Sequence, residues 1–478
     1  MENKMNTFAN AVINQEARTE NGMKARASTA SACVDLFFKI GAMRGQDPIP
    51  AFTAAFVEDF DVATRIVLWA RDVREGAGER EIFRKILKHS VKNVPDTVQH
   101  LIDKTPQLGR WDDLLVLIDD EVDDNIQEYV IRKIATALIS GDGLCAKWMP
   151  RKGPVAVKLR TALQLSPKQY RKLLVNRTKV VETQMCAKDW DNINFSHVPS
   201  LAASRYKKAF NRNTSKYKEW AEKLVKGDKT VKVNAGAVYP YDVLKGVSNY
   251  AYGVPSLDNT ELDVVKAQWE ALPNYIGDAN VLPLVDVSGS MVTTIGGSKT
   301  IAMDVAVSLG LYCADKNTGK FKDTFLTFSE SPQLLNLKGN ILQKVQRMVT
   351  SNWGMNTNLH AAFNKILDVA LKGKVPQEEM PQTLLIMSDM QFDACVKQDD
   401  SAIEMIRRKY EEAGYQMPNV VFWNLNARDN VPVKFNEQGV ALVSGFSPSI
   451  LKAVLSGDME NLTPVGVMMK TLMVERYA

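Results

Sequence analysis

One stretch of sequence decides the fold of the C-terminal half of this chain: Val281-Leu282-Pro283-Leu284-Val285-Asp286-Val287-Ser288-Gly289-Ser290. A short apolar run that is closed by small polar residues is typical of a buried parallel strand leading into a loop. Open α/β sheets bind their ligands in loops at the carboxyl ends of such strands. We therefore predict a strand at 281–285 and a ligand site in the loop that follows it.

The predicted loop offers oxygen atoms of the kind that hard cations prefer. Asp286, Ser288 and Ser290 supply one carboxylate and two hydroxyls within a few residues. Mg²⁺ and Mn²⁺ favour oxygen ligands in octahedral geometry and keep some of their waters. Asp and Ser are also common at helix N-caps, so a cap on a following helix is the alternative explanation of this loop taken by itself.

Strand-like and helix-like runs alternate after this stretch. We predict further strands at 324–328, 383–387, 419–423 and 440–443, and helices at 299–313, 359–371, 402–412, 448–455 and 465–474. Such alternation indicates a doubly wound parallel sheet with helices packed on its faces. Residues 279–478 are therefore predicted to form an α/β domain.

The sequence before this domain is predicted to be helical. Amphipathic runs separated by short breaks extend from about residue 26 to 278, for example at 59–70 and 79–87. Many short helices in succession indicate a solenoid or a ring of helices, although no clean sequence period marks a repeat. The predicted order is an N-terminal extension at 1–25, a helical array at 26–278 and the α/β domain, which makes the fold class α + α/β.

Positive charge is concentrated in one part of the helical region. Residues 145–235 contain 21 Lys and Arg against 6 Asp and Glu, although the whole chain has a net charge of only +5. Aromatic residues are interleaved with the cations, and cations beside exposed rings suit single-stranded nucleic acid. The alternative is a solvated helical face whose rings belong to the core. The candidate RNA-binding residues are Arg151, Lys152, Lys168, Arg171, Lys172, Arg177, Lys179, Arg205, Lys207, Lys208 and Arg212.

Two later loops complete a known pattern. Thr357 follows Trp353-Gly354-Met355-Asn356, and Asp389 follows the predicted strand at 383–387 and Ser388. Together with Asp-x-Ser-x-Ser, these loops resemble the metal-ion-dependent adhesion site of a von Willebrand factor A domain. The resemblance implies that Asp286, Ser288, Ser290, Thr357 and Asp389 bind Mg²⁺ or Mn²⁺, directly or through water, and leave one position open for a partner's carboxylate.

Three sequence motifs in the helical half extend the resemblance. They are Trp69-Ala70-Arg71-Asp72-Val73-Arg74-Glu75-Gly76-Ala77-Gly78-Glu79-Arg80, Gly109-Arg110-Trp111-Asp112-Asp113-Leu114 and Ala146-Lys147-Trp148-Met149-Pro150-Arg151. With the A-domain loops, they resemble a family that joins a helical region to a C-terminal A domain, with an architecture similar to the TROVE module of Ro proteins. That resemblance implies HEAT-like helical repeats and binding of small noncoding or misfolded RNA, as a ribonucleoprotein. Arg71, Arg74 and Arg110 are equally well explained as buried partners of Asp72, Asp112 or Asp113.

Other features of the sequence narrow the class of protein. No stretch approaches the roughly 20 apolar residues of a membrane span, and the five scattered cysteines form no Cys-x-x-Cys pair. No nucleophile–base pair or pair of catalytic carboxylates is evident. We expect a cytoplasmic, non-enzymatic protein that binds RNA through its helical region. The alternative is a metal-dependent adaptor that grips an acidic protein ligand and binds no nucleic acid.

Overall fold

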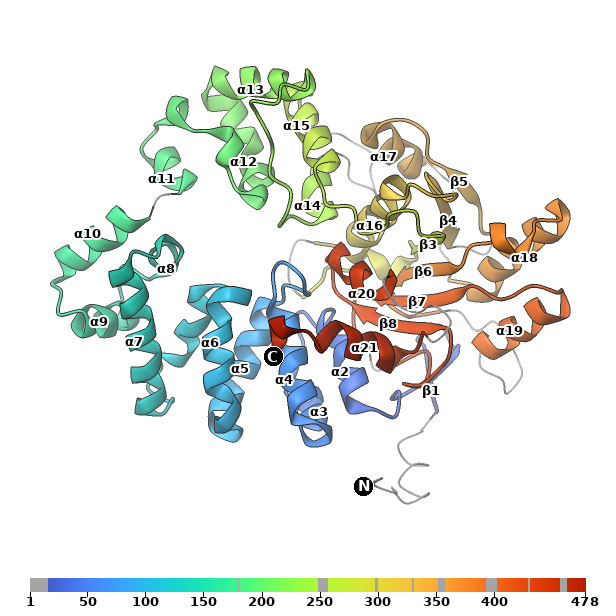
Figure 1. The fold of residues 1–478 in the computed structure, drawn as a ribbon, viewed down its shortest axis with the longest axis horizontal. Helices are drawn as coiled ribbons and strands as arrows, with labels where there is room; N and C mark the ends of the chain where they lie inside the picture. Colours follow the sequence, from blue (N-terminus) through green and yellow to red (C-terminus); the bar gives the residue numbers. More distant parts are fainter. Residues whose placement is uncertain are drawn as a thin grey trace. The chain divides into compact units, whose positions relative to one another are not determined.

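A computed structural model describes residues 16–178, 180–247, 257–296, 300–328, 331–350, 357–392, 402–428, 430–455 and 462–478 (Figure 1). The chain divides into two compact units. We call residues 1–66 with 235–478 the sheet unit, and residues 67–234 the helical unit. The predicted division near residue 278 stays a prediction, whereas the contacts place the first 66 residues in the same unit as the sheet.

The sheet unit is built on a six-stranded sheet with the order β5-β4-β3-β6-β7-β8. Every pairing is parallel except that of the edge strand β5 with β4. The strands are β3 (Val281–Asp286), β4 (Thr324–Phe328), β5 (Leu334–Asn336), β6 (Thr383–Ser388), β7 (Asn419–Asn424) and β8 (Val440–Ser444). The predicted α + α/β class is thus confirmed, with the addition of a short antiparallel edge strand that the sequence analysis did not predict.

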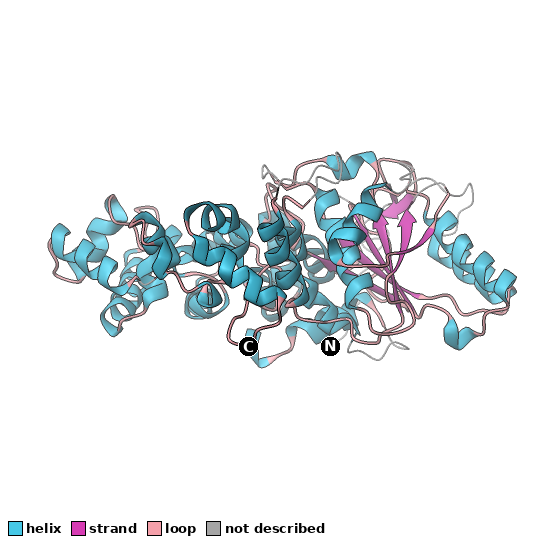
Figure 2. Cartoon of the chain, turned by 90° about the horizontal axis from the view of Figure 1, so that it is seen from above, coloured by secondary structure: helices cyan, strands magenta, loops and turns pink. Residues whose placement is uncertain are grey.

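Helices flank the sheet, as Figure 2 shows. Helix α16 packs against β3, helix α18 against β4, and helices α2 and α21 against β8. Gly310 of α16 lies against Val285 and Phe325, where a side chain would collide with both, so the helix packs closely on the strand that precedes Asp286. The helices of this unit are α2 (Ala32–Ile40), α3 (Ile49–Glu58), α14 (Pro240–Leu244), α15 (Asn259–Glu270), α16 (Ala302–Lys316), α17 (Ile341–Thr350), α18 (Leu359–Gly373), α19 (Ala402–Glu412), α20 (Leu451–Leu455) and α21 (Pro464–Leu472).

The N-terminal residues add a small hairpin and a helix to this unit. Strands β1 (Glu16–Arg18) and β2 (Lys24–Arg26) pair antiparallel, and Arg26 forms an isolated bridge with Val431. Helix α2 begins at its N-cap Ser31 and ends at Gly41, whose main-chain N–H donates to Ser444 Oγ at the end of β8. The sheet unit therefore contains sequence from both ends of the chain.

Helix α4 (Phe60–Arg71) begins in the sheet unit, and its last residues belong to the helical unit. The main contacts of the helical unit join elements that are close in sequence, such as α5 with α6, α7 with α9 and α12 with α13. This pattern agrees with a helical array. The helices are α5 (Arg80–Asn93), α6 (Pro95–Leu108), α7 (Asp124–Ser140), α8 (Gly143–Trp148), α9 (Pro154–Ala162), α10 (Pro167–Arg177), α11 (Val181–Cys186), α12 (Ser200–Asn213) and α13 (Ser215–Val225), with a 3₁₀ helix η1 (Trp111–Leu117). Across the described parts of both units, no helix combines the length and apolar character that crossing a bilayer requires.

Candidate metal centre and basic helix faces

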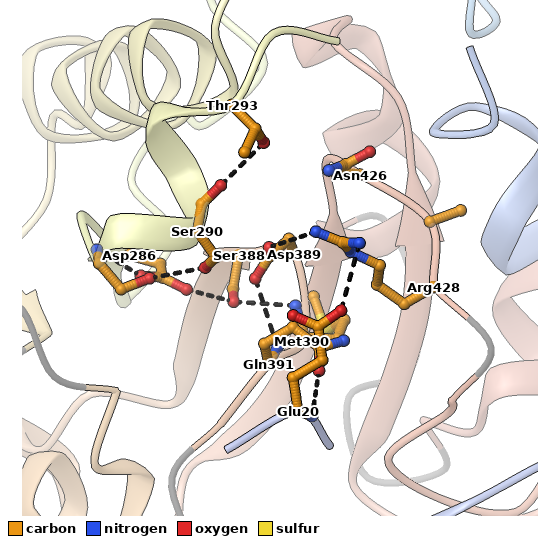
Figure 3. A network of polar contacts seen from close by, with 12 residues as sticks. Glu20, Asp286, Ser290, Thr293, Ser388, Asp389, Met390, Gln391, Asn426 and Arg428 are labelled. Carbon is orange, nitrogen blue, oxygen red and sulfur yellow. Dashed lines mark hydrogen bonds and ion pairs between the residues drawn. The ribbon is translucent and has the colours of Figure 1, made fainter. Parts of the chain in front are cut away.

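The two predicted aspartates meet where the strand order of the sheet reverses. Strands β3, β4 and β5 extend to one side and β6, β7 and β8 to the other, so the switch point lies between β3 and β6. Asp286 is the last residue of β3, and Asp389 directly follows β6. Because these strands pair in parallel, their carboxyl ends lie side by side at the position where open α/β sheets bind ligands. Figure 3 shows the resulting network of polar contacts.

Asp286 is a fully buried carboxylate that accepts hydrogen bonds from two groups. The Ser388 hydroxyl donates to one oxygen at 2.5 Å, and the main-chain N–H of Ser288 donates to the other at 2.9 Å. Burial, and then the nearby Asp389 carboxylate, raise the pKa of Asp286 to about 6, although the hydrogen bonds oppose this shift. The side chain is thus held rigidly in surroundings that do not favour its negative charge.

Asp389 is also fully buried, and one of its oxygens is unsatisfied. Within the described residues, Oδ2 has no hydrogen-bond partner, and Nη2 of Arg428 lies 3.8 Å away. Burial raises the pKa of Asp389, although Arg428 and a hydrogen bond from Ser290 counteract the rise. A buried carboxylate oxygen without a partner is costly, and a bound cation removes that cost.

The hydroxyl residues lie beside these carboxylates. Ser288 Oγ and Ser290 Oγ are 3.0 Å apart. Thr357 is fully buried, and its hydroxyl donates to the main-chain O of Gln391 at 2.9 Å, which ties it to the loop that follows β6. The four residues Trp353 to Asn356 of the predicted middle loop lie outside the described residues.

This set of donors fits a hard divalent cation. Among the residues that the structure describes, no three His, Cys, Asp or Glu side chains come together as a metal cluster. A cation at Asp286 and Asp389 would therefore complete its coordination with serine and threonine hydroxyls and with water. Carboxylates, hydroxyls and water suit Mg²⁺ and Mn²⁺ better than the softer metals that prefer His or Cys.

Four residues of the network were not predicted from the sequence. Ser388 bonds to Asp286, Gln391 bonds to the N-terminal hairpin, and Arg428 and Glu20 form an ion pair next to Asp389. Ser388 precedes Asp389 at the end of an apolar strand, so its position was a usable signal. Nothing in the local sequence around Glu20 or Arg428 indicates proximity to the sheet.

Helix α10 presents three of the predicted basic residues on one face. Lys168, Arg171 and Lys172 are all exposed, and their spacing places them on the same side of the helix. The opposite side is buried through Tyr170 and Leu174. Within the described residues, no carboxylate lies at ion-pair distance from these three cations. Their charge is therefore available to a partner.

Helix α12 carries a second basic row. Arg205, Lys208 and Arg212 are exposed at helical spacing, whereas the adjacent Lys207 is buried with Phe210 on the other side. Lys207 is therefore buried while its neighbour Lys208 is exposed, because one residue along a helix turns the side chain by about 100°. Of the other candidates, Arg151, Lys152 and Arg177 are exposed, and Lys179 lies outside the described residues.

The predicted use of interleaved aromatic rings for stacking is wrong for most of them. Tyr170, Phe195, Phe210, Tyr217 and Trp220 are buried. Several pack on one another, with ring centroids 5.3 Å apart for Phe195 and Phe210 and 5.4 Å apart for Tyr217 and Trp220. These rings form the core beneath the basic faces and are not accessible to bases. Trp148, Trp190 and Tyr206 are half-buried.

The arginines in the sequence motifs of the helical unit have a structural explanation. Arg71 Nε lies 2.7 Å from Asp113 Oδ2, and both side chains are almost completely buried. Arg84 Nε approaches the other oxygen of Asp113 at 2.8 Å, and the main-chain N–H of Arg110 donates to Asp113 as well. The carboxylate of Asp113 thus joins α4, α5 and η1.

Two family models match consecutive parts of the chain. A family model described as a domain of unknown function, DUF2828, matches residues 19–127 and 125–282. The chain belongs to this family. A second model, also described as a domain of unknown function, DUF7788, matches residues 280–471. These two descriptions give no activity, so the chemistry of the site has to come from its residues.

Two individual proteins are similar over most of the chain. "Uncharacterized protein L728" of Acanthamoeba polyphaga mimivirus is 32% identical over 515 residues, which cover 95% of this chain and 86% of that protein. The crystal structure of Deinococcus radiodurans RO (RSR) protein is similar with a TM-score of 0.44 and 13% identity, over 93% of this chain and 99% of that chain. A likeness at this TM-score carries no functional argument.

Proposed function

We propose that this protein binds RNA through the basic faces of its helical unit and does not act as an enzyme. The observation that carries the proposal is the row of exposed cations on α10, Lys168, Arg171 and Lys172, which have no acidic partner among the described residues. Uncompensated cations on one helix face attract a polyanion. Arg205, Lys208 and Arg212 form a second row of exposed cations on α12.

The choice of RNA among polyanions rests on the resemblance of the sequence phrases to the TROVE module. The helical unit supports it in one respect, because its main contacts are local in sequence, as in repeat arrays that bind extended ligands. Burial of most aromatic rings shifts the expected mode of binding from base stacking to phosphate contact. We therefore expect affinity that depends strongly on salt and weakly on base sequence.

The decisive experiment measures binding of a structured RNA with a single-stranded 3′ tail across a salt series, by fluorescence anisotropy. The variant Lys168→Gln, Arg171→Gln, Lys172→Gln should lower the slope of log affinity against log salt by about 2, at about 0.7 for each phosphate contact on a single strand. At 0.1 M salt, the same relation predicts an affinity loss of about 100-fold for three contacts.

A matched control removes three exposed lysines from the sheet unit, with the variant Lys338→Gln, Lys372→Gln, Lys434→Gln. It changes the net charge by the same amount and should leave the salt slope unchanged. Equal losses in both triple variants would mean that overall charge, and not the α10 face, governs binding. Absence of binding by the wild-type protein at low salt would refute the RNA proposal.

We also propose that the sheet unit is a von Willebrand factor A-like domain that binds Mg²⁺ or Mn²⁺. The residues that would hold the cation are Asp286, Ser288, Ser290, Thr357 and Asp389. The buried Oδ2 of Asp389, which has no hydrogen-bond partner among the described residues, supports this assignment. A bound cation of this type provides an electrophilic position for an oxygen ligand. Calorimetry with Mn²⁺ should detect one site in the wild type and none in Asp286→Ala, and equal affinity in both proteins would refute the site.

The second candidate function is a metal-dependent adaptor for an acidic protein ligand. The burial of the aromatic rings favours it, because those rings were part of the case for nucleic acid. The adaptor would lose its partner on addition of EDTA or in Asp286→Ala, and it would bind no RNA. The RNA experiment therefore separates the two functions, whereas the metal site is common to both.

A further inference from the structure

The hairpin of β1 and β2 is attached to the loop that carries Asp389. Three consecutive residues at its turn bond to this loop. The Thr19 hydroxyl donates to the main-chain O of Phe392 at 2.6 Å, and the Glu20 N–H donates to Gln391 Oε1 at 2.6 Å. The Asn21 side-chain amide donates to the main-chain O of Gln391 at 2.8 Å. The backbone of Glu20 is therefore held from both sides against the edge of the candidate metal centre.

The Asn21 amide also reaches the centre itself. It lies 3.4 Å from the hydroxyl of Thr357, which is one of the predicted metal ligands. On the other side, Thr19 is buried and Met23 is buried, so the turn is packed and not merely adjacent. These bonds hold the backbone of Glu20 beside the candidate ligand residues.

The carboxylate of Glu20 faces an arginine that faces Asp389. Glu20 Oε1 lies 3.3 Å from Arg428 Nη1, and Nη2 of the same guanidinium lies 3.8 Å from Asp389 Oδ2 (Figure 3). The Glu20 side chain is 61% exposed. Within the described residues, Arg428 is the only partner of its carboxylate. Arg428 thus supplies the positive charge between an acidic residue of the hairpin and an acidic residue of the sheet.

A divalent cation would change this balance. It would bring two positive charges to Asp286 and Asp389. These positive charges would repel the guanidinium of Arg428. Mg²⁺ requires six oxygen ligands, and carboxylates are preferred among protein side chains. The hairpin holds the Glu20 backbone in place while its side chain has one replaceable ion pair. Glu20 is therefore positioned to exchange Arg428 for the cation.

We propose that Glu20 is the chain's own carboxylate ligand at the metal centre, bound directly or through one water. This inference rests on the proposed metal site. It gives the hairpin a role as a built-in occupant of the coordination position that would otherwise be open to an acidic partner. An external acidic ligand then has to displace Glu20 before it can bind.

The test measures Mn²⁺ affinity of the full chain by isothermal titration calorimetry. Glu20→Gln keeps the size of the side chain and removes its charge, and it should weaken Mn²⁺ binding by about tenfold, as loss of a supporting carboxylate does at other metal sites. The matched control is Glu412→Gln, which removes an exposed carboxylate from α19 of the same unit. The control should stay within twofold of the wild type.

A double-mutant cycle with Arg428→Gln separates a ligand role from an indirect one. If Glu20 only keeps Arg428 away from the aspartates, Glu20→Gln has no effect on Mn²⁺ affinity once Arg428 is replaced, and the proposal is overturned. If Glu20 binds the cation, the weakening of about tenfold persists in the Arg428→Gln background.

Hydrogen exchange of residues 16–26 adds a structural readout. Mn²⁺ should slow exchange in the wild type and not in Glu20→Gln, because the ligand ties the hairpin to the centre. Unchanged Mn²⁺ affinity in Glu20→Gln together with lost binding in Asp286→Ala overturns the role of Glu20 and leaves the metal site intact. Unchanged affinity in Asp286→Ala refutes the metal site and this inference with it.

Discussion

Replacement of Asp286 by Asn should stabilise the metal-free protein at neutral pH. The pKa of Asp286 is raised from its ordinary value of 3.8 to about 6, because the side chain is buried beside Asp389. At about 1.36 kcal/mol for each pKa unit, ionisation of this carboxyl in the folded protein costs about 3 kcal/mol above pH 6. Asn is neutral and nearly the same shape, so it avoids this cost.

The substitution also loses part of the hydrogen bonding. The amide oxygen of Asn can still accept from the Ser288 N–H, but the Ser388 hydroxyl has to reverse its bond and accept from the amide. This exchange costs about 1 kcal/mol. The expected net gain for Asp286→Asn is therefore about 2 kcal/mol in the free energy of unfolding at pH 7.5 in EDTA.

The pH dependence has a definite sign. A carboxyl whose pKa is higher in the folded than in the unfolded state destabilises the protein fully when the pH is above the folded-state pKa. It has no such effect when the pH is below the unfolded-state pKa. The ionisation cost should thus fall to about 1.6 kcal/mol at pH 5, which leaves Asp286→Asn a net advantage of about 0.6 kcal/mol. Near pH 4 the hydrogen-bond cost should exceed the remaining ionisation cost, so the variant should be slightly less stable than the wild type.

Urea unfolding in EDTA at pH 7.5 and pH 5, repeated with Mg²⁺, measures these differences. Mg²⁺ should stabilise the wild type by about 2.7 kcal/mol at a concentration of 100 times its dissociation constant, and it should not stabilise Asp286→Asn. A variant less stable than the wild type in EDTA at pH 7.5 would refute the reasoning about buried charge. A variant that is still stabilised by Mg²⁺ would refute the role of Asp286 as a ligand.

Two further substitutions test the packing of each unit. Gly41→Ala should destabilise the sheet unit by about 1–3 kcal/mol, because the added methyl would lie 2.6 Å from the main-chain O of Ser444 and the backbone there cannot move aside. Urea unfolding should show no such loss in the control Gly236→Ala, whose added methyl would meet no atom within 4 Å. Asp113→Asn should destabilise the helical unit by about 3–5 kcal/mol, since it leaves the buried guanidinium of Arg71 without its charge partner. Its Mn²⁺ affinity should equal that of the wild type, and a loss of both properties would mean that the units do not unfold separately.

The strands of the sheet were largely predictable because their pattern is local. The strand β4 has the predicted bounds, and β3, β6, β7 and β8 extend one residue beyond them. Continuous apolar runs of this length can be satisfied only by burial on both faces, which is what a central parallel strand provides. The edge strand β5 escaped prediction because it has three residues and is largely exposed.

The composition of the basic segment 145–235 does not show which of its side chains are exposed. Helical periodicity correctly indicates amphipathic helices, but the aromatic rings of an amphipathic helix can belong to either side. Phe210 and Tyr217 face the core, whereas Arg205 and Arg212 face solvent. The difference is set by which residues the neighbouring helices cover, and that depends on packing between helices.

The sequence by itself determined the strand at 281–285, the oxygen-rich loop after it and the concentration of positive charge in residues 145–235. These features depend on residues that are neighbours in the chain. The tertiary structure alone brought Ser388 to Asp286, across a separation of 102 residues, and Glu20 to the loop of Asp389, across more than 350 residues. Such contacts arise from the parallel pairing of β3 with β6 and from the docking of the N-terminal hairpin. Both are long-range events, whose free energy is spread over many residues and leaves no local pattern in the sequence.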